Sequence, residues 1–347
     1  MPRHNLILSF FLGDKNLFIT CGGSRKYPAL SSYSPRHQPV WYKPIIFYDH
    51  TLVTFWRLIS DQKNRVADLY ASITVPVIMD TLILTVVILV ITGSIIGFAS
   101  GFLGVGGGFL MVPVQFWLLT SLGTDPTLAI RIAFGTSLAV VIPTAISGSW
   151  AHHCRKCVLV RPLTLMIVPA VIGSISGATI ATHLPGPLLE FFFGILILVA
   201  AMVMLLVRAP PDSLPMTENR LAFVFWGLTF GCISGLLGIG GGIVMVPVMI
   251  LILRFPLHKA IGTSTVLMVF SSIGGAITYI VNGLSVPGLP PYSFGYVNLL
   301  QGGILAAVSV PMAQVGVRAV HRFSAGQVKI VFCIVMIVIG LHMIGIF

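Results

Sequence analysis

Charged residues are scarce in this sequence. Asp, Glu, Lys and Arg make up 8% of its 347 residues, whereas 56% are hydrophobic. A water-soluble globular domain has about 25% charged residues, so this composition excludes one. The mean hydropathy of +1.00 is typical of an integral membrane protein. Because lipid offers no hydrogen bonds to the backbone, we expect an all-α polytopic protein that crosses the cell membrane several times.

Carboxylates are almost missing from the apolar part of the chain. From Asp80 onward there are five, and only Glu190 falls inside an apolar stretch: Asp80, Asp125, Glu190, Asp212 and Glu218. No deep His/Asp/Glu constellation appears, and the G-x-G-G-G runs lack the Lys of a phosphate-binding P-loop. We therefore expect a protein that is not an enzyme. A carboxylate or His deep in a membrane span often marks proton coupling. Because such residues are almost absent here, the sequence does not identify a coupling ion.

The five cysteines lack the dense, even spacing of a disulfide-stapled secreted domain. Cys154 and Cys157 lie in His152-His153-Cys154-Arg155-Lys156-Cys157, which holds four N/S donors within six residues. Structural zinc sites normally join two separated pairs of ligands, so we expect a basic loop here rather than a metal site. No cofactor is expected.

The formal charge of +11 does not predict a nucleic-acid partner, because the basic residues sit in short loops between apolar segments. Residues 1–78 carry nine of the twenty Lys and Arg and hold no run long enough to span a bilayer. We interpret them as an N-terminal extension, either disordered or a misassigned start. Met79, directly before an apolar run, is the alternative start.

From residue 79 the chain divides into two halves of five apolar segments each: repeat 1 over 79–208, a linker over 209–220, and repeat 2 over 221–347. The first half is expected to form helices at about 81–103, 109–121, 129–151, 163–182 and 187–207. The second is expected at about 221–237, 243–254, 259–281, 296–317 and 326–346.

A glycine-rich motif recurs at the same place in both halves. GFLGVGGGFLMVPV begins at Gly101 and GLLGIGGGIVMVPV at Gly235, and each interrupts a helix before a short apolar piece. A second motif, Gly-Thr-Ser, follows at Gly135 and Gly262. The pair of motifs in the same order predicts two structural repeats, each with a broken helix pair and three further helices.

Loop charges predict that the two repeats are inverted. The loop after the third segment holds Arg155, Lys156 and Arg161 in repeat 1, and its equivalent, residues 282–295, holds no charge. After the fourth segment the asymmetry reverses, with Arg318, Arg322 and Lys329 in repeat 2. Basic loops stay in the cytoplasm, so equivalent loops lie on opposite sides and the linker lies inside. If the short pieces are re-entrant, the count of crossings per half becomes even, which this charge pattern does not fit.

The paired G-x-x-G-x-G-G-G-x-x-x-V-P motifs, each followed by Gly-Thr-Ser, resemble the TauE/SafE family of sulfite exporters, bacterial and archaeal permeases. The resemblance covers roughly residues 81–347. It implies transport of small sulfur-containing anions such as sulfite, sulfonates or thiosulfate, and it does not select among them. The long basic N-terminus departs from the family pattern.

A non-helical segment within the hydrocarbon layer is tolerated only where the protein buries it or where it lines a water-filled cavity. A short helix that starts there, with Pro113 or Pro247 in its first turn, presents free N–H groups and the positive end of its dipole, which suits an anion. The alternative is that the glycines only allow close helix packing. The duplication favours a site, as in transporters with broken helices. The predicted substrate-binding residues are Gly104, Gly106, Gly107, Gly108, Thr136, Ser137, Gly238, Gly240, Gly241, Gly242, Thr263 and Ser264.

The Thr and Ser hydroxyls among these residues have an alternative role, since they often bond to a carbonyl four residues earlier in membrane helices. Ser100 and Ser234 precede the two loops at equivalent places and have the same two alternatives. The sequence thus predicts a multi-pass permease for a small anion, working by alternating access. A channel that uses the same loops as a filter is the alternative. The sequence does not decide whether several copies assemble into a homo-oligomer.

Overall fold

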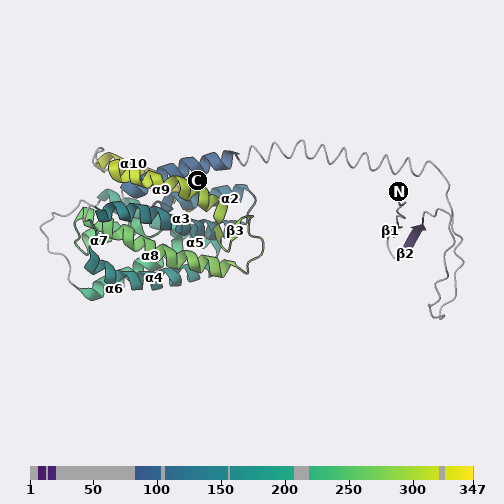
Figure 1. Ribbon diagram of the computed structural model, residues 1–347, viewed down its shortest axis with the longest axis horizontal. Helices are drawn as coiled ribbons and strands as arrows, with labels where there is room; N and C mark the ends of the chain where they lie inside the picture. Colours follow the sequence, from purple (N-terminus) through teal and green to yellow (C-terminus); the bar gives the residue numbers. More distant parts are fainter. Residues whose placement is uncertain are drawn as a thin grey trace. The chain divides into compact units, whose positions relative to one another are not determined.

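The computed structural model describes residues 7–12, 15–20, 83–102, 106–154, 157–206, 219–319 and 325–346. From residue 83 onward this part of the chain is almost entirely helical (Figure 1). The first half contains the helix Ile83–Phe102, α2 (Gly108–Ser121), α3 (Pro126–Cys154), α4 (Val160–His183) and α5 (Gly186–Leu206). The second contains α6 (Arg220–Leu237), α7 (Gly242–Leu251), α8 (Leu257–Gly283), α9 (Leu299–Ala319) and α10 (Ala325–Met343).

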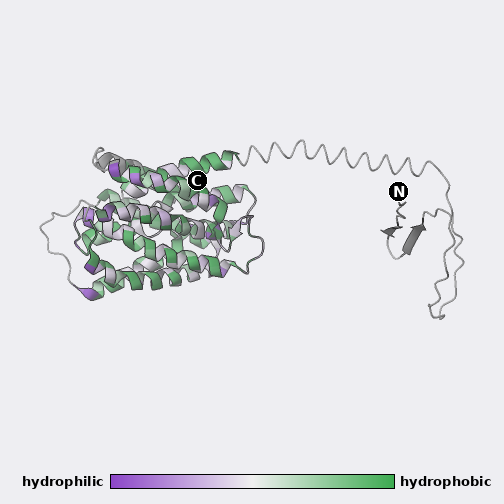
Figure 2. Cartoon of the chain, in the orientation of Figure 1, coloured by the Kyte–Doolittle hydropathy of each residue, from purple (hydrophilic) through white to green (hydrophobic). Residues whose placement is uncertain are grey.

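These helices confirm the all-α polytopic fold. Seven of them are long and apolar enough to cross a membrane: Ile83–Phe102, α3, α4, α5, α6, α8 and α9. Large apolar side chains such as Leu84, Val168 and Phe225 are exposed on the outside, as lipid-facing residues must be. Figure 2 shows hydrophobic residues along the helices and the most hydrophilic ones near their ends. The protein is a multi-pass membrane protein.

Two small antiparallel hairpins complete the described structure. In the N-terminal unit, Met1–Asp68, strand β1 (Ile7–Leu12) pairs with β2 (Lys15–Thr20). The rest of residues 1–78 lies outside the described residues, so the expectation about the start of the chain stays a prediction. The second hairpin, β3 (Ser293–Phe294) with β4 (Val297–Asn298), lies in the connection between α8 and α9. The sequence does not predict this hairpin, because its strands have two residues each.

Glycines allow two pairs of helices to pack backbone against backbone. On α6, Gly227, Gly231 and Gly235 lie against Met166, Ala170 and Ser174 of α4, and a Cβ on any of the three glycines would overlap the α4 backbone. On the helix Ile83–Phe102, Gly93, Gly97 and Gly101 lie against Leu305, Ser309 and Ala313 of α9, and a Cβ on Gly97 or Gly101 would overlap the α9 backbone. Both pairs run parallel. The two sets are spaced identically, so equivalent helices make equivalent contacts in the two halves.

The longest helices, α3 and α8, pack against each other in opposite directions at the centre of the bundle. Gly135 of α3 lies beside Tyr279 of α8, and Leu138 of α3 lies beside Gly275. The outer pair α5 and α10 is also antiparallel, because Gly194 lies beside Gly340 and Ala201 accepts a hydrogen bond from Cys333. Each of these pairs joins one helix to its equivalent in the other half.

The short helices α2 and α7 turn back toward the end of the bundle from which the preceding helix came. The helix Ile83–Phe102 runs parallel to α9, whose start adjoins the α8–α9 connection, and α2 leads into the start of α3 beside that same connection. In the second half, α6 starts beside the start of α4, and α7 leads back to the start of α8 beside Leu159. If the preceding helix and the short helix act as one returning pair, three further helices remain in each half, and re-entrant pieces are then compatible with an odd number of crossings. The number of crossings in each half stays a prediction.

Candidate functional site

The two glycine loops place left-handed backbone at matching positions. In the first, Gly106 has φ 78° and Gly107 has φ 69°, and in the second, Gly240 has φ 75° and Gly241 has φ 81°. A residue with a Cβ adopts such angles only at a cost of about 1–2 kcal/mol, so the motif needs glycine here. Gly107 directly precedes α2 and Gly241 directly precedes α7. Gly104, also predicted to bind substrate, lies outside the described residues.

The loops of the two halves touch each other at the middle of the central helices. A Cβ on Gly108 would lie 2.8 Å from the Cα of Ile239, and one on Gly106 would lie 2.7 Å from the Met268 sulfur of α8. In the equivalent contact, a Cβ on Gly240 would lie 2.9 Å from Val141 of α3. Gly106 to Gly108 and Gly238 to Gly242 are all buried. The predicted glycines from both halves are therefore brought together, in a closed arrangement.

Backbone donors without acceptors gather at the second loop. Met245 at the first turn of α7 donates its N–H to the Gly241 carbonyl at 3.1 Å. The N–H groups from Ile239 to Val244 have no acceptor among the described residues. Buried N–H groups are nearly always paired, and each unpaired one costs several kcal/mol in a membrane interior. Six neighbouring donors beside the positive end of a helix dipole favour an anion at this place.

Two buried serine hydroxyls lie beside the same loop. A Cβ on Gly241 would lie 3.7 Å from the Ser234 oxygen of α6, and one on Gly240 would lie 3.5 Å from the Ser272 oxygen of α8. Both hydroxyls are buried and have no hydrogen-bond partner. Each could donate to the same ligand as the loop N–H groups. Ser234 was one of the sequence candidates, and Ser272 was missed, although its spacing of eight residues from Ser264 places both on one face of α8.

The hydroxyls of the Gly-Thr-Ser motifs meet backbone groups. Thr136 accepts the N–H of Asn298 at 2.9 Å, and Thr263 accepts that of Leu159 at 3.0 Å. Ser137 donates to the carbonyl of Gly238 and so ties α3 to the second loop. Ser264 bonds to the carbonyl of Ile261 in its own helix, at 2.8 Å. All four side chains are fully buried. Their role in substrate binding stays a prediction.

Pro113 and Pro247 lie in the second turn of their helices, not in the first as expected. Each is the sixth residue of its helix, because α2 begins at Gly108 and α7 at Gly242. A proline inside a helix removes the bond to the carbonyl four residues earlier. The carbonyls of Phe109 and Ile243 thus lose their helical donor, which loosens the helix close to each loop.

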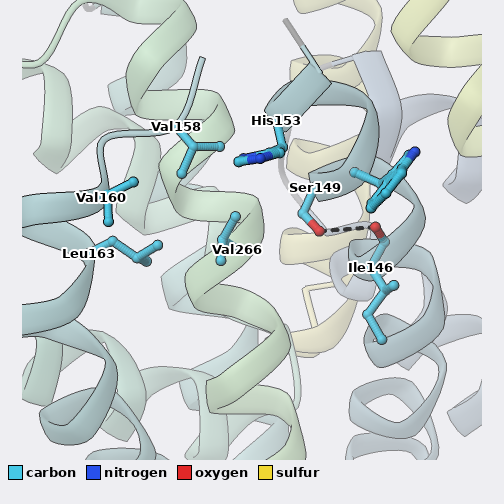
Figure 3. Close-up of a pocket in the computed structure, with 8 residues that line it drawn as sticks. Ile146, Ser149, His153, Val158, Val160, Leu163 and Val266 are labelled. Carbon is cyan, nitrogen blue, oxygen red and sulfur yellow. Dashed lines mark hydrogen bonds between the residues drawn. The ribbon is translucent and has the colours of Figure 1, made fainter. Parts of the chain in front are cut away.

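A pocket of about 330 Å³ lies between the end of α3, the α3–α4 connection and α8. Ser149 and His153 of α3 lie across it from Val158, Leu163 and Val266 (Figure 3). It contains none of the predicted substrate-binding residues. Between it and the glycine loops lies a buried apolar cluster of Val141, Ala145 and Met268. The buried side chains of this cluster separate the pocket from the glycine loops.

Comparisons with known proteins agree on a family. The model of the family described as Sulfite exporter TauE/SafE matches residues 89–343. A "Probable membrane transporter protein" of Methanocaldococcus jannaschii is 29% identical over 259 residues, which cover 74% of this chain and 94% of the relative. The "Probable membrane transporter protein YunE" of Bacillus subtilis is 29% identical over 281 residues, 75% of this chain and 98% of the relative. No solved structure matches.

Proposed function

Because the chain belongs to the Sulfite exporter TauE/SafE family, we propose that it is a permease that moves a small anion across the membrane. The proposed substrates are sulfur oxyanions of the sulfite, sulfonate and thiosulfate class. The proposed mechanism is alternating access between two inverted repeats. The relatives named as probable membrane transporters support transport, and the geometry of the second glycine loop supports an anion.

One observation carries the choice of an anion. The N–H groups from Ile239 to Val244 are neighbouring donors without acceptors among the described residues, and the hydroxyls of Ser234 and Ser272 adjoin them. A cation would meet positive dipole ends here, whereas an anion would accept hydrogen bonds from several groups at once. The first loop, with the same left-handed glycines and in contact with Ile239, would complete the site from the other half.

The packing of the halves supports the inverted repeats. The parallel pairs α4–α6 and Ile83–Phe102–α9 are equivalent, and α3–α8 joins equivalent helices in opposite directions. Such a pattern supports an approximate two-fold axis through the glycine loops. Rocking of one half against the other about this axis would open the loops to each end in turn, as in other inverted-repeat carriers. The apolar cluster of Val141, Ala145 and Met268 closes one of these routes in the present conformation.

Flux in proteoliposomes tests this function. We expect sulfite or methanesulfonate uptake that saturates with concentration and that accelerates when the vesicles are preloaded with the same anion, because a carrier exchanges one substrate for another. Flux that rises linearly without such counterflow would indicate a channel. Saturable transport of cations, with none of anions, would contradict the proposed function.

A further inference from the structure

Arg131 is a cation inside the membrane-spanning helix α3, close to its start. Its Nη2 donates to the Leu184 carbonyl at 2.8 Å, and its Nη1 lies 3.4 Å from the Tyr296 hydroxyl. The guanidinium carbon is 6.0 Å from the centre of the Tyr296 ring. Its Nε is buried and has no hydrogen-bond acceptor. The guanidinium therefore bridges the α4–α5 connection and the β3–β4 hairpin.

The charge of Arg131 lacks a carboxylate partner in the described part of the chain. Asp125, six residues earlier, uses its Oδ1 to accept the N–H groups of Thr127 and Leu128 at the start of α3. A half-buried cation held by one carbonyl and one long contact to a hydroxyl is poorly compensated. In membrane proteins such uncompensated charges mark ligand and ion pathways.

A chain of contacts leads from Arg131 to the second glycine loop. The Tyr296 ring packs edge-on against Tyr279, with ring centres 6.4 Å apart. The Tyr279 hydroxyl donates to the carbonyl of Gly235 at 3.1 Å, at the end of α6. One turn after Arg131 on α3, Phe134 lies against Gly238, whose added Cβ would be 2.5 Å from the Phe134 Cα. Arg131 thus lies about one turn of α3 from the residue that contacts the second glycine loop.

The other end of the bundle has no equivalent of this cation among the described residues. Arg131 lies four residues before the Gly-Thr-Ser motif of α3, and the residue four positions before the same motif in α8 is His258, which is exposed. The exposed basic residues Arg161 and Arg220 lie at the starts of α4 and α6, at the opposite end from Leu184. Arg131 is therefore a feature of one entrance alone.

We propose that Arg131 binds the transported anion at the entrance formed by the α4–α5 connection and the β3–β4 hairpin. The inference rests on the proposed function and adds to it a residue that binds the substrate at one entrance. A guanidinium presents a planar fork of donors that matches two oxygens of one ligand. The anion replaces the Leu184 carbonyl and the Tyr296 hydroxyl, and its release toward Gly238 restores them. A small oxyanion with at least two oxygens fits this fork better than a spherical halide.

The test uses the full chain in proteoliposomes with methanesulfonate, and chloride as the spherical competitor. Arg131→Lys keeps the charge and loses the fork, so the half-saturating methanesulfonate concentration rises about tenfold and the preference over chloride narrows. Arg131→Gln removes the charge as well, so it raises the half-saturating methanesulfonate concentration further. Arg161→Lys and Arg161→Gln, at the opposite end of the bundle, are the matched controls and keep the wild-type values.

Tyr296→Phe separates binding from a structural role. It removes the hydroxyl that competes with the anion and leaves the guanidinium in place, so methanesulfonate binds more tightly and the half-saturating concentration falls. A purely structural Arg131 would give the opposite result or no change. If Arg131→Lys and Arg131→Gln keep the wild-type half-saturating concentration and selectivity, the proposed role of Arg131 is overturned, while the proposed function is not affected. A wild-type protein that carries cations and no oxyanion would overturn the proposed function and this inference together.

Discussion

The hydroxyl of Thr136 accepts a hydrogen bond from the backbone N–H of Asn298 at 2.9 Å, across 162 residues of sequence. Asn298 directly precedes α9, so the bond satisfies a donor at the start of that helix. The equivalent bond, from the N–H of Leu159 to Thr263, satisfies the residue before α4. Each central helix thus caps the start of a helix in the other half: α3 caps α9, and α8 caps α4. These two bonds join the halves at both ends of the bundle.

Removing either threonine hydroxyl should lower stability. In Thr136→Val the buried N–H of Asn298 loses its acceptor, and in Thr263→Val the part-buried N–H of Leu159 does, which costs about 1–3 kcal/mol for a fully buried group. We expect a lower thermal unfolding temperature for the purified protein and normal flux per folded molecule. Thr229→Val, at an exposed hydroxyl bonded within its own helix, is the control. Unchanged stability together with abolished flux would instead assign these hydroxyls to the substrate.

The glycine contacts between parallel helices predict equal damage at equivalent places. Gly97→Ala and Gly231→Ala should both destabilise the bundle, because the added Cβ would overlap the backbone of α9 or α4. Gly148→Ala and Gly303→Ala are matched controls in helices, with open space around the added Cβ. They should stabilise slightly, by up to about 1 kcal/mol, because alanine favours a helix more than glycine does. The thermal unfolding of the four variants in detergent measures the contrast, and equal effects in all four would contradict it.

The helices of this protein could be predicted from the sequence because the bilayer leaves few choices. The helix expected at about 187–207 forms as Gly186–Leu206, and the one at about 221–237 as Arg220–Leu237. A run of about 20 apolar residues between polar breaks has to span, and it has to be helical. The duplicated motif likewise predicted that a glycine loop interrupts a helix at the same place in both halves, and the structure adds that Gly106, Gly107, Gly240 and Gly241 have left-handed backbone.

The partners of polar side chains could not be predicted from the same pattern. Arg131 lies near the start of α3, and only the fold places Leu184 and Tyr296 against it. Ser272 stands in an apolar stretch of α8, and its place beside Gly240 depends on how α8 crosses the loop of its own half. Such contacts join residues far apart in sequence, and periodicity carries no information about them.

The unpaired serine hydroxyls separate a binding role from a structural one. Ser234→Ala and Ser272→Ala remove groups that have no partner, so stability should stay the same or rise slightly. If these hydroxyls donate to the anion, flux at low substrate concentration should fall about tenfold, the usual effect of losing a hydrogen bond to a charged group. Flux and thermal unfolding are measured on the same preparations.

Ser176→Ala is the control for both serines, because the Ser176 hydroxyl is exposed and bonded to Ile172 within α4. We expect it to keep wild-type flux. Wild-type flux in both Ser234→Ala and Ser272→Ala would remove these residues from the site and leave the backbone donors alone as the proposed ligands.

Gly241 is the most direct test of the anion site. Gly241→Leu should abolish transport while membrane insertion persists, because a side chain would fill the space where the N–H groups of α7 begin; the nearest atom to an added Cβ is Ser234 Cβ, at 3.3 Å. Gly107→Leu should do the same in the first loop, but there the Cβ would also overlap Ile96 and disturb packing. Left-handed backbone adds a penalty of about 1–2 kcal/mol at either place. Gly123→Leu isolates that penalty, since Gly123 has φ 88° and open space around it. If the second glycine loop binds the anion, we expect Gly123→Leu to lose a similar amount of stability and to transport normally. Equal flux in Gly241→Leu and Gly123→Leu would show that the loop binds nothing.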